Sequence, residues 1–209
     1  KNPKILDEIK LAKAFCHANG CYGAESYIKG FSGYAIELLV YHYGSFLNFI
    51  NEFEKIQGKS VIDIEKHYKS KNEVFMDMNE SKLHSPVILV DPTYKRRNAL
   101  AALSYETFEK FRKICREFLK NPSGKFFEEK KLDLEKIETK ARKKKLDFIL
   151  LKAETDKQEG DIAGTKLLKF YNHITSEFDK YFEIKSRGFE YKNGQSARYF
   201  FVAKRKKEI

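Results

Sequence analysis

Hydrophobic residues near the start of the chain repeat at the spacing of an α-helix. Between residues 5 and 19 they fall every three or four positions, at Ile5, Ile9, Ala12 and Cys16. This pattern predicts an amphipathic helix that stops at Asn19-Gly20, because an asparagine followed by glycine favours a turn. Lys13 lies at the edge of the apolar stripe, so its ammonium group either reaches water along the surface or points at an anion.

A loop over 20–33, punctuated by glycines, leads into a second apolar run over 31–46. Glycine permits positive φ and close backbone approach, so such a loop usually turns tightly against something. The apolar run is too continuous for a surface helix and predicts a mostly buried one, with Ser32 as its N-cap. Glu37 lies inside this run, where its carboxylate is either paired with a basic side chain or solvated at one edge of the helix.

The helical pattern resumes over 46–56 after a break at Gly44-Ser45. Two short apolar stretches, over 60–64 and 86–90, have the composition of strands. The polar stretch between them, 67–84, has no clear period and is interpreted as an insertion or loop.

Three consecutive cations, Lys95, Arg96 and Arg97, follow the second strand. We expect a long helix over 99–120 directly after them, unless Ser104 begins a second helix with its own cap. Cations next to a helix N-terminus favour a phosphate or base edge nearby, although such a cluster is more often a solvated surface patch.

The segment Asn121-Pro122-Ser123-Gly124 is the clearest boundary in the chain. Beyond it the pattern predicts helix, strand, helix and a strand hairpin, over 134–145, 146–153, 164–181, 182–191 and 197–204. This order favours helices on one face of an antiparallel sheet. Tyr199, Phe200 and Phe201 could stack on bases, but strand alternation favours the core for most of them.

The predicted fold class is therefore α+β, with a mainly helical domain over 1–124 and a small α+β domain over 125–209. The chain has 41 Lys and Arg against 30 Asp and Glu, a net charge of +11. Up to Phe127 there are 20 basic and 15 acidic residues, and after it 21 and 15, so both parts are basic. This balance favours a polyanionic partner such as nucleic acid, although Lys/Glu-rich chains also occur for other reasons, as in thermophiles.

No apolar run approaches the length of a membrane helix, and the charged first ten residues do not resemble a signal peptide. The first residue is Lys rather than Met, which is compatible with a piece of a longer protein. Three cysteines without framework spacing fit a reduced, cytoplasmic setting. Asp63-Ile64-Glu65 alternates as two carboxylates on a strand would, but no third carboxylate has an evident place, so we predict no catalytic or metal site within the chain.

Several ordered motifs resemble the second domain of archaeal-type (class I) CCA-adding enzymes, the tRNA nucleotidyltransferases. Their order in the chain is LAKAF, GCYGAE, KGFSGY, ELL and YGSF, then Asp91-Pro92, Arg97-Asn98, Ala101-Ala102 and Ser104, and more weakly Cys115 to Phe118 with Pro122 and Phe126-Phe127. The resemblance covers about 120 residues. The remainder fits the family's third domain in element order only.

This resemblance implies a function in adding or repairing the 3′-terminal CCA of tRNA from CTP and ATP. Lys13 and Tyr22 would contact the triphosphate of the incoming nucleotide. Arg97, supported by Asp91, would read the base together with tRNA phosphates. Lys29, Lys95, Arg96 and Asn98 are further candidate RNA contacts. A homodimer of the intact protein is compatible with the resemblance.

The chain also departs from the family. The family's head domain, which holds two Mg²⁺, is expected to precede this region. We therefore predict that the chain alone is inactive. The family's C-terminal part, which binds the tRNA, is expected to be truncated here. Lys29 replaces an arginine, which keeps the charge but loses bidentate geometry. Tyr94 stands where the family commonly has an acidic residue. The alternative is a stand-alone RNA-binding module with the same fold and no transferase activity.

Overall fold

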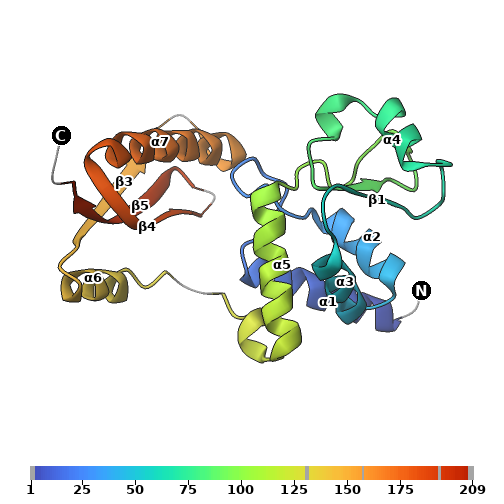
Figure 1. Cartoon of the computed structure of the whole chain (residues 1–209), viewed down its shortest axis with the longest axis horizontal. Coiled ribbons are helices and arrows are strands. Elements are labelled where there is room, and N and C mark those ends of the chain that lie inside the picture. Colours follow the sequence, from blue (N-terminus) through green and yellow to red (C-terminus); the bar gives the residue numbers. More distant parts are fainter. Residues whose placement is uncertain (1–2, 130–131, 157, 193, 207–209) are drawn as a thin grey trace. The chain divides into compact units, whose positions relative to one another are not determined.

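A computed structural model describes residues 3–129, 132–156, 158–192 and 194–206 (Figure 1). The chain divides into two compact units, unit 1 over Lys1–Lys130 and unit 2 over Lys131–Ile209. The division falls six residues beyond the expected boundary at Gly124. The reason is that Phe126 and Phe127 pack against Phe15, with ring centroids 6.3 and 5.6 Å away, and so belong to unit 1.

Four helices build the main core of unit 1: α1 (Pro3–Ala18), α2 (Gly33–Tyr43), α3 (Phe46–Lys55) and α5 (Tyr105–Lys120). Their apolar faces meet around fully buried phenylalanines, including Phe15, Phe31, Phe49 and Phe111. The predicted cap of α2 is confirmed, since Ser32 Oγ accepts a hydrogen bond from the Ala35 amide at 3.1 Å. Gly44, with φ of 80°, ends α2 in the left-handed conformation that glycine adopts readily.

The two predicted strands of unit 1 are also confirmed: β1 (Ser60–Asp63) pairs in parallel with the fully buried β2 (Val87–Val90). The interpretation of 67–84 as a loop is wrong. This stretch contains α4 (Lys71–Asp77), capped by Ser70, and a 3₁₀ turn, η1 (Glu80–Lys82). Its apolar positions are sparse because the helix is only seven residues long, and it buries Val74 and Met78 in a small cluster with Ile88 and Val90.

The long helix expected from Ala99 is also wrong, and the alternative start at Ser104 is confirmed. Ser104 Oγ accepts a hydrogen bond from the Thr107 amide at 3.1 Å, and α5 begins at Tyr105. Residues 99–103 form turns in which Leu100 and Leu103 are buried. The cations at 95–97 therefore do not lie next to a helix N-terminus. A second 3₁₀ turn, η2 (Gly124–Phe127), closes unit 1 against α1.

Unit 2 confirms the predicted order and the α+β class: α6 (Leu134–Lys143), β3 (Asp147–Glu154), α7 (Gly160–Tyr181), β4 (Phe182–Tyr191) and β5 (Ser196–Arg205). The strands form an antiparallel sheet in the order β3-β5-β4. The expectation that both helices cover one face is wrong (Figure 1). Tyr199 and Phe201 of β5 pack beneath α7, whereas Phe200 and Val202 pack with Ala141 of α6 on the other face.

The rings of β5 are therefore core, as alternation favoured, since Tyr199, Phe200 and Phe201 are all buried. On the α6 face, the Phe200 ring covers Gly188 of β4 so closely that a Cβ atom at position 188 would overlap it. This glycine is needed for close approach and not for a special φ.

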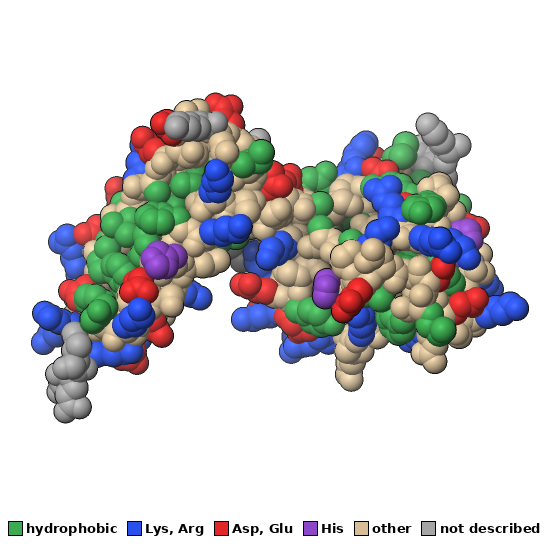
Figure 2. Space-filling model, turned by 90° about the horizontal axis from the view of Figure 1, so that it is seen from above, with side chains coloured by type: hydrophobic (Ala, Val, Ile, Leu, Met, Phe, Trp, Pro, Cys, Tyr) green, Lys and Arg blue, Asp and Glu red, His purple; other side chains and the backbone are tan. Residues whose placement is uncertain are grey.

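Three free cysteines, Cys16, Cys21 and Cys115, are buried in unit 1. Burial raises the pKa of Cys21 to about 11, so its thiol stays protonated at neutral pH. No helix in the described ranges is long and apolar enough to cross a bilayer. On the face drawn in Figure 2, lysine and arginine side chains are spread among acidic ones over both units and do not gather in one patch.

Candidate functional site

The first turn of α2 brings Lys13 and Tyr22 together. The loop before α2 is held by backbone hydrogen bonds, in which the Phe31 amide donates to the Cys21 carbonyl and the Gly23 amide to the Phe31 carbonyl, each at 2.8 Å. A Cβ atom built on Gly33 would lie 3.0 Å from the Tyr22 hydroxyl oxygen and 3.8 Å from Lys13 Nζ. Both predicted triphosphate contacts therefore lie next to a helix N-terminus, whose dipole favours an anion.

Glu37 forms an ion pair with Lys13. Lys13 Nζ donates a hydrogen bond to Glu37 Oε1 at 2.6 Å, and about half of the Glu37 side chain is exposed. Glu37 is thus both paired with a basic side chain and partly solvated, so each of the two alternatives expected from the sequence holds in part. An anion that binds Lys13 would have to share it with this carboxylate.

A hollow of about 310 Å³ lies beside Lys13 and Tyr22, between α1 and the end of unit 1. His17, one turn after Lys13 on α1, also lines it, and its Nδ1 lies 3.1 Å from Glu129 Oε1. The His17 ring centroid lies 6.0 Å from that of Tyr22. Sequence reasoning missed His17, although its spacing of four from Lys13 already puts the two on one face of the helix.

The next residue of α2, Tyr34, connects to the second predicted pair, Asp91 and Arg97. The Tyr34 hydroxyl donates to Asp91 Oδ1 at 3.1 Å, and the Arg97 guanidinium lies over the Tyr34 ring, 5.5 Å from its centroid. Tyr34 thus contacts both Asp91 and Arg97. Its contacts make it part of this group of residues.

Asp91 is fully buried, and its two oxygens have different surroundings. Oδ1 accepts hydrogen bonds from the Thr93 amide at 2.8 Å and the Thr93 hydroxyl at 2.7 Å, besides Tyr34. Oδ2 has no hydrogen-bond partner in the described ranges and lies 3.5 Å from Arg97 Nη1. Burial alone would raise the pKa of Asp91, but the bonds from Thr93 and Tyr34 and the charge of Arg97 hold the pKa below its ordinary value.

Together these side chains form the α2 N-terminal site, which consists of Lys13, Tyr22, Tyr34, Glu37, Asp91 and Arg97. Gly33 contacts one predicted pair and Tyr34 the other, so adjacent positions of one helix turn link them. Arg97 is exposed and Lys13 partly so, which leaves both cations accessible to a ligand.

Lys95 and Arg96 make contacts inside unit 1. Arg96 Nη2 lies 2.9 Å and Lys95 Nζ 3.8 Å from the carboxylate of Asp77, the last residue of α4. Tyr68 donates its hydroxyl to the same carboxylate at 2.8 Å, and Lys95 lies over its ring. The bonds with Arg96 and Tyr68 lower the pKa of Asp77. The segment 65–85 therefore holds the loop 91–98 in place.

Asn98 is buried, and its amide bonds entirely within the protein. Its Nδ2 donates to the Lys82 carbonyl and to Ser85, and its Oδ1 accepts from the amides of Leu89 and Leu100, all at 2.8–3.0 Å. These bonds give Asn98 a part in the structure of the loop, and its predicted RNA contact stays a prediction. Lys29, by contrast, is exposed, and its backbone is left-handed with φ of 53°.

A family model described as "tRNA nucleotidyltransferase, second domain" matches residues 7–128, more than half of the chain and all of the α2 N-terminal site. The chain belongs to the tRNA nucleotidyltransferase family. Among curated tRNA nucleotidyltransferase relatives, it is similar to the CCA-adding enzyme of Methanocaldococcus jannaschii, with 41% identity over 140 residues, 65% of this chain and 30% of the relative.

The CCA-adding enzyme of Nanoarchaeum equitans is 45% identical over 109 residues, 52% of this chain and 28% of the relative. That of Methanosarcina mazei is 34% identical over 178 residues, 84% of this chain and 37% of the relative, so this match continues into unit 2. The chain thus spans about a third of the length of these tRNA nucleotidyltransferases.

Proposed function

We propose that unit 1 serves as the central domain of a CCA-adding tRNA nucleotidyltransferase, which completes or repairs the 3′ end of tRNA with CTP and ATP. The α2 N-terminal site binds the incoming nucleotide. Lys13 and Tyr22 hold the triphosphate at the start of α2, and Arg97 contacts the base and tRNA phosphates. The observation that carries this proposal is the single turn of α2 that joins both pairs through Gly33 and Tyr34.

The chemistry of each residue suits its role. Lysine is a compact charge for phosphate, and the tyrosine hydroxyl is a donor. Arginine presents a planar fork that can pair with a base edge or a phosphate. The buried, ionised carboxylate of Asp91 orients the Arg97 guanidinium from the protein side.

Phosphoryl transfer in such enzymes uses divalent cations, which stabilise developing charge on the phosphates. In the described ranges, no group of three His, Cys, Asp or Glu is arranged to hold one. We therefore assign no metal-dependent step to these residues, and we propose that the metal is held outside them. A chain that binds nucleotide without transferring it is the expected behaviour.

Nucleotide binding by the 209-residue chain tests this proposal. Titration calorimetry with CTP and ATP should show binding that Lys13→Ala and Tyr22→Phe weaken, by about tenfold for the lysine. The matched control is Lys10→Ala, which removes the same charge from α1 at an exposed position paired with Asp7. Equal effects of Lys10→Ala and Lys13→Ala would contradict the assignment.

A stand-alone RNA-binding module is the second candidate, and the pairing of Lys13 with Glu37 favours it, because this carboxylate opposes an incoming triphosphate. It predicts affinity for tRNA without affinity for CTP or ATP. An assay of CCA addition to a tRNA transcript completes the test, since robust turnover by this chain alone would contradict our assignment of the metal to other parts.

A further inference from the structure

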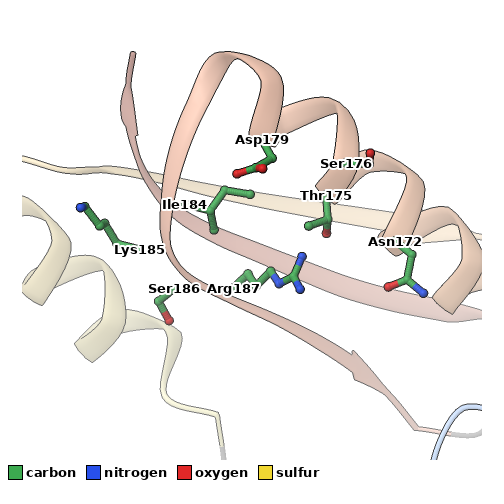
Figure 3. A pocket seen from close by; sticks show the side chains of 8 residues that line it. All are labelled: Asn172, Thr175, Ser176, Asp179, Ile184, Lys185, Ser186 and Arg187. Atoms are coloured by element: carbon green, nitrogen blue, oxygen red, sulfur yellow. The ribbon is translucent and has the colours of Figure 1, made fainter. Parts of the chain in front are cut away.

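Unit 2 contains a polar groove between α7 and β4 with a volume of about 540 Å³ (Figure 3). It is lined by Asn172, Thr175, Ser176 and Asp179 of α7 and by Ile184, Lys185, Ser186 and Arg187 of β4. The four residues of α7 fall at helical spacing, so they form one polar stripe along the helix. This groove lies in a different unit from the α2 N-terminal site.

Arg187 lies on the face of the sheet that α7 covers. It pairs with Phe201, a core residue beneath α7, and paired residues of an antiparallel sheet share a face. The strand has an extra residue, Lys185, between Ile184 and Ser186, and this bulge is what turns Arg187 inward. An apolar side chain is the usual choice at such a position, so the arginine calls for an explanation.

The guanidinium of Arg187 rests on the ring of Tyr171, 5.9 Å from its centroid. In the described ranges it has no ion pair. Figure 3 shows its side chain pointing from β4 toward α7, whereas Lys185 points away from the groove. Arg187 therefore faces the groove with a positive charge that no carboxylate of the described residues neutralises.

Other donors line the same groove as this guanidinium. Asn172 and Ser176 are exposed and offer amide or hydroxyl hydrogens, while the Thr175 hydroxyl already donates to the Tyr171 carbonyl at 2.8 Å. Asp179 opposes an anion, but it lies one turn beyond Thr175, away from Asn172. The end of the groove at Arg187 and Asn172 is therefore suited to a group with several acceptor oxygens and a negative charge.

We propose that this groove binds a backbone phosphate of RNA, with Arg187 as its central contact. A planar fork held on an aromatic ring suits phosphate oxygens. Residues 131–209 hold 20 Lys and Arg against 13 Asp and Glu, a net charge of +7, which favours a polyanion over an isolated phosphate. The choice of RNA rests on the proposed function.

Fluorescence anisotropy with a labelled tRNA transcript and the 209-residue chain tests this inference. Arg187→Ala should weaken binding about five- to tenfold and lower the slope of log K against log salt by about 1. Arg187→Lys should recover only part of the affinity, and Asp179→Asn should strengthen binding. The matched control is Arg198→Ala, which removes the same charge from β5, where position 198 alternates with Tyr199 and so faces away from α7.

Unchanged tRNA affinity in Arg187→Ala, or an equal loss in Arg198→Ala, would overturn the proposal. So would a parallel loss of CTP affinity, which would identify a free nucleotide as the ligand, or displacement of tRNA by a phosphoserine peptide at equal concentration. Lys13→Ala separates the two proposals. If it loses CTP affinity while Arg187→Ala keeps tRNA affinity, only the groove is disproved; the reverse pattern disproves only the nucleotide site.

Discussion

The exposed guanidinium of Arg97 lies 3.5 Å from the fully buried carboxylate of Asp91. Asp91 follows β2 directly, so the strand fixes the acid and the acid fixes the cation. A ligand that contacts Arg97 therefore meets a side chain whose direction is set from the core.

Asp91→Ala should destabilise the protein by about 2–4 kcal/mol, because the donors of Thr93 and Tyr34 would lose their acceptor in a buried place. Urea denaturation followed by circular dichroism measures the change. Asp7→Ala is the control, since Asp7 is exposed and pairs with the exposed Lys10. A loss below about 0.5 kcal/mol for Asp91→Ala would show that the loop closes without this carboxylate.

Acid should remove part of this stability. The pKa of Asp91 is lowered in the folded protein, so the folded state binds fewer protons than the unfolded chain. The contribution is complete above the ordinary aspartate pKa of about 3.9 and is lost as pH falls through the lowered value. Urea denaturation at a series of pH values should therefore give a flatter acid limb for Asp91→Asn. Parallel curves would contradict the lowered pKa.

Gly33→Ala should weaken CTP binding roughly three- to tenfold without lowering the unfolding free energy. The added methyl group would lie 3.0 Å from the Tyr22 hydroxyl oxygen, so Tyr22 must move, while alanine is a better helix former than glycine. Calorimetry and urea denaturation on the same sample check both parts. Gly124→Ala is the control, because no atom of the described residues lies within 4 Å of its added atom.

Glu37→Gln should strengthen binding of CTP, by about two- to fivefold, because Lys13 would no longer share its charge with a carboxylate. Calorimetry at low ionic strength is the suitable measurement. Glu52→Gln, which breaks the exposed pair with Lys55, should leave affinity unchanged. Weaker binding by Glu37→Gln would mean instead that Glu37 positions Lys13.

Asp77→Asn should loosen the loop that carries Arg97, since Lys95, Arg96 and Tyr68 all contact this carboxylate. Hydrogen exchange followed by mass spectrometry should show faster exchange in the peptide over 91–98. Glu177→Gln, which breaks an exposed pair in unit 2, is the control. Unchanged exchange would show that the backbone bonds of the loop suffice.

The elements that sequence predicted well are those with a long, regular pattern or a definite cap. The helix over 5–19 and the caps Ser32 and Ser104 follow from local chemistry, because a serine hydroxyl serves the nearest free amide. The helix α4 was missed because seven residues give barely two turns, too few for a visible period.

Contacts between distant segments could not be predicted in this way. The local sequence around Arg96 does not indicate that Asp77 lies beside it, and the local sequence around Glu37 does not indicate that it faces Lys13. The resemblance to a family placed Lys13, Tyr22, Asp91 and Arg97 together, but the link through Tyr34 depends on how α2 meets β2. The two-sided sheet of unit 2 was missed because helix order alone does not say which face a helix covers.

The fit of the Phe200 ring over Gly188 has an evolutionary consequence. A side chain at position 188 can be accommodated only if position 200 becomes smaller, and a smaller residue there would uncover the α6 face of the sheet. The two positions should therefore vary together among related sequences, as a glycine with a large ring or as a larger residue with a small one.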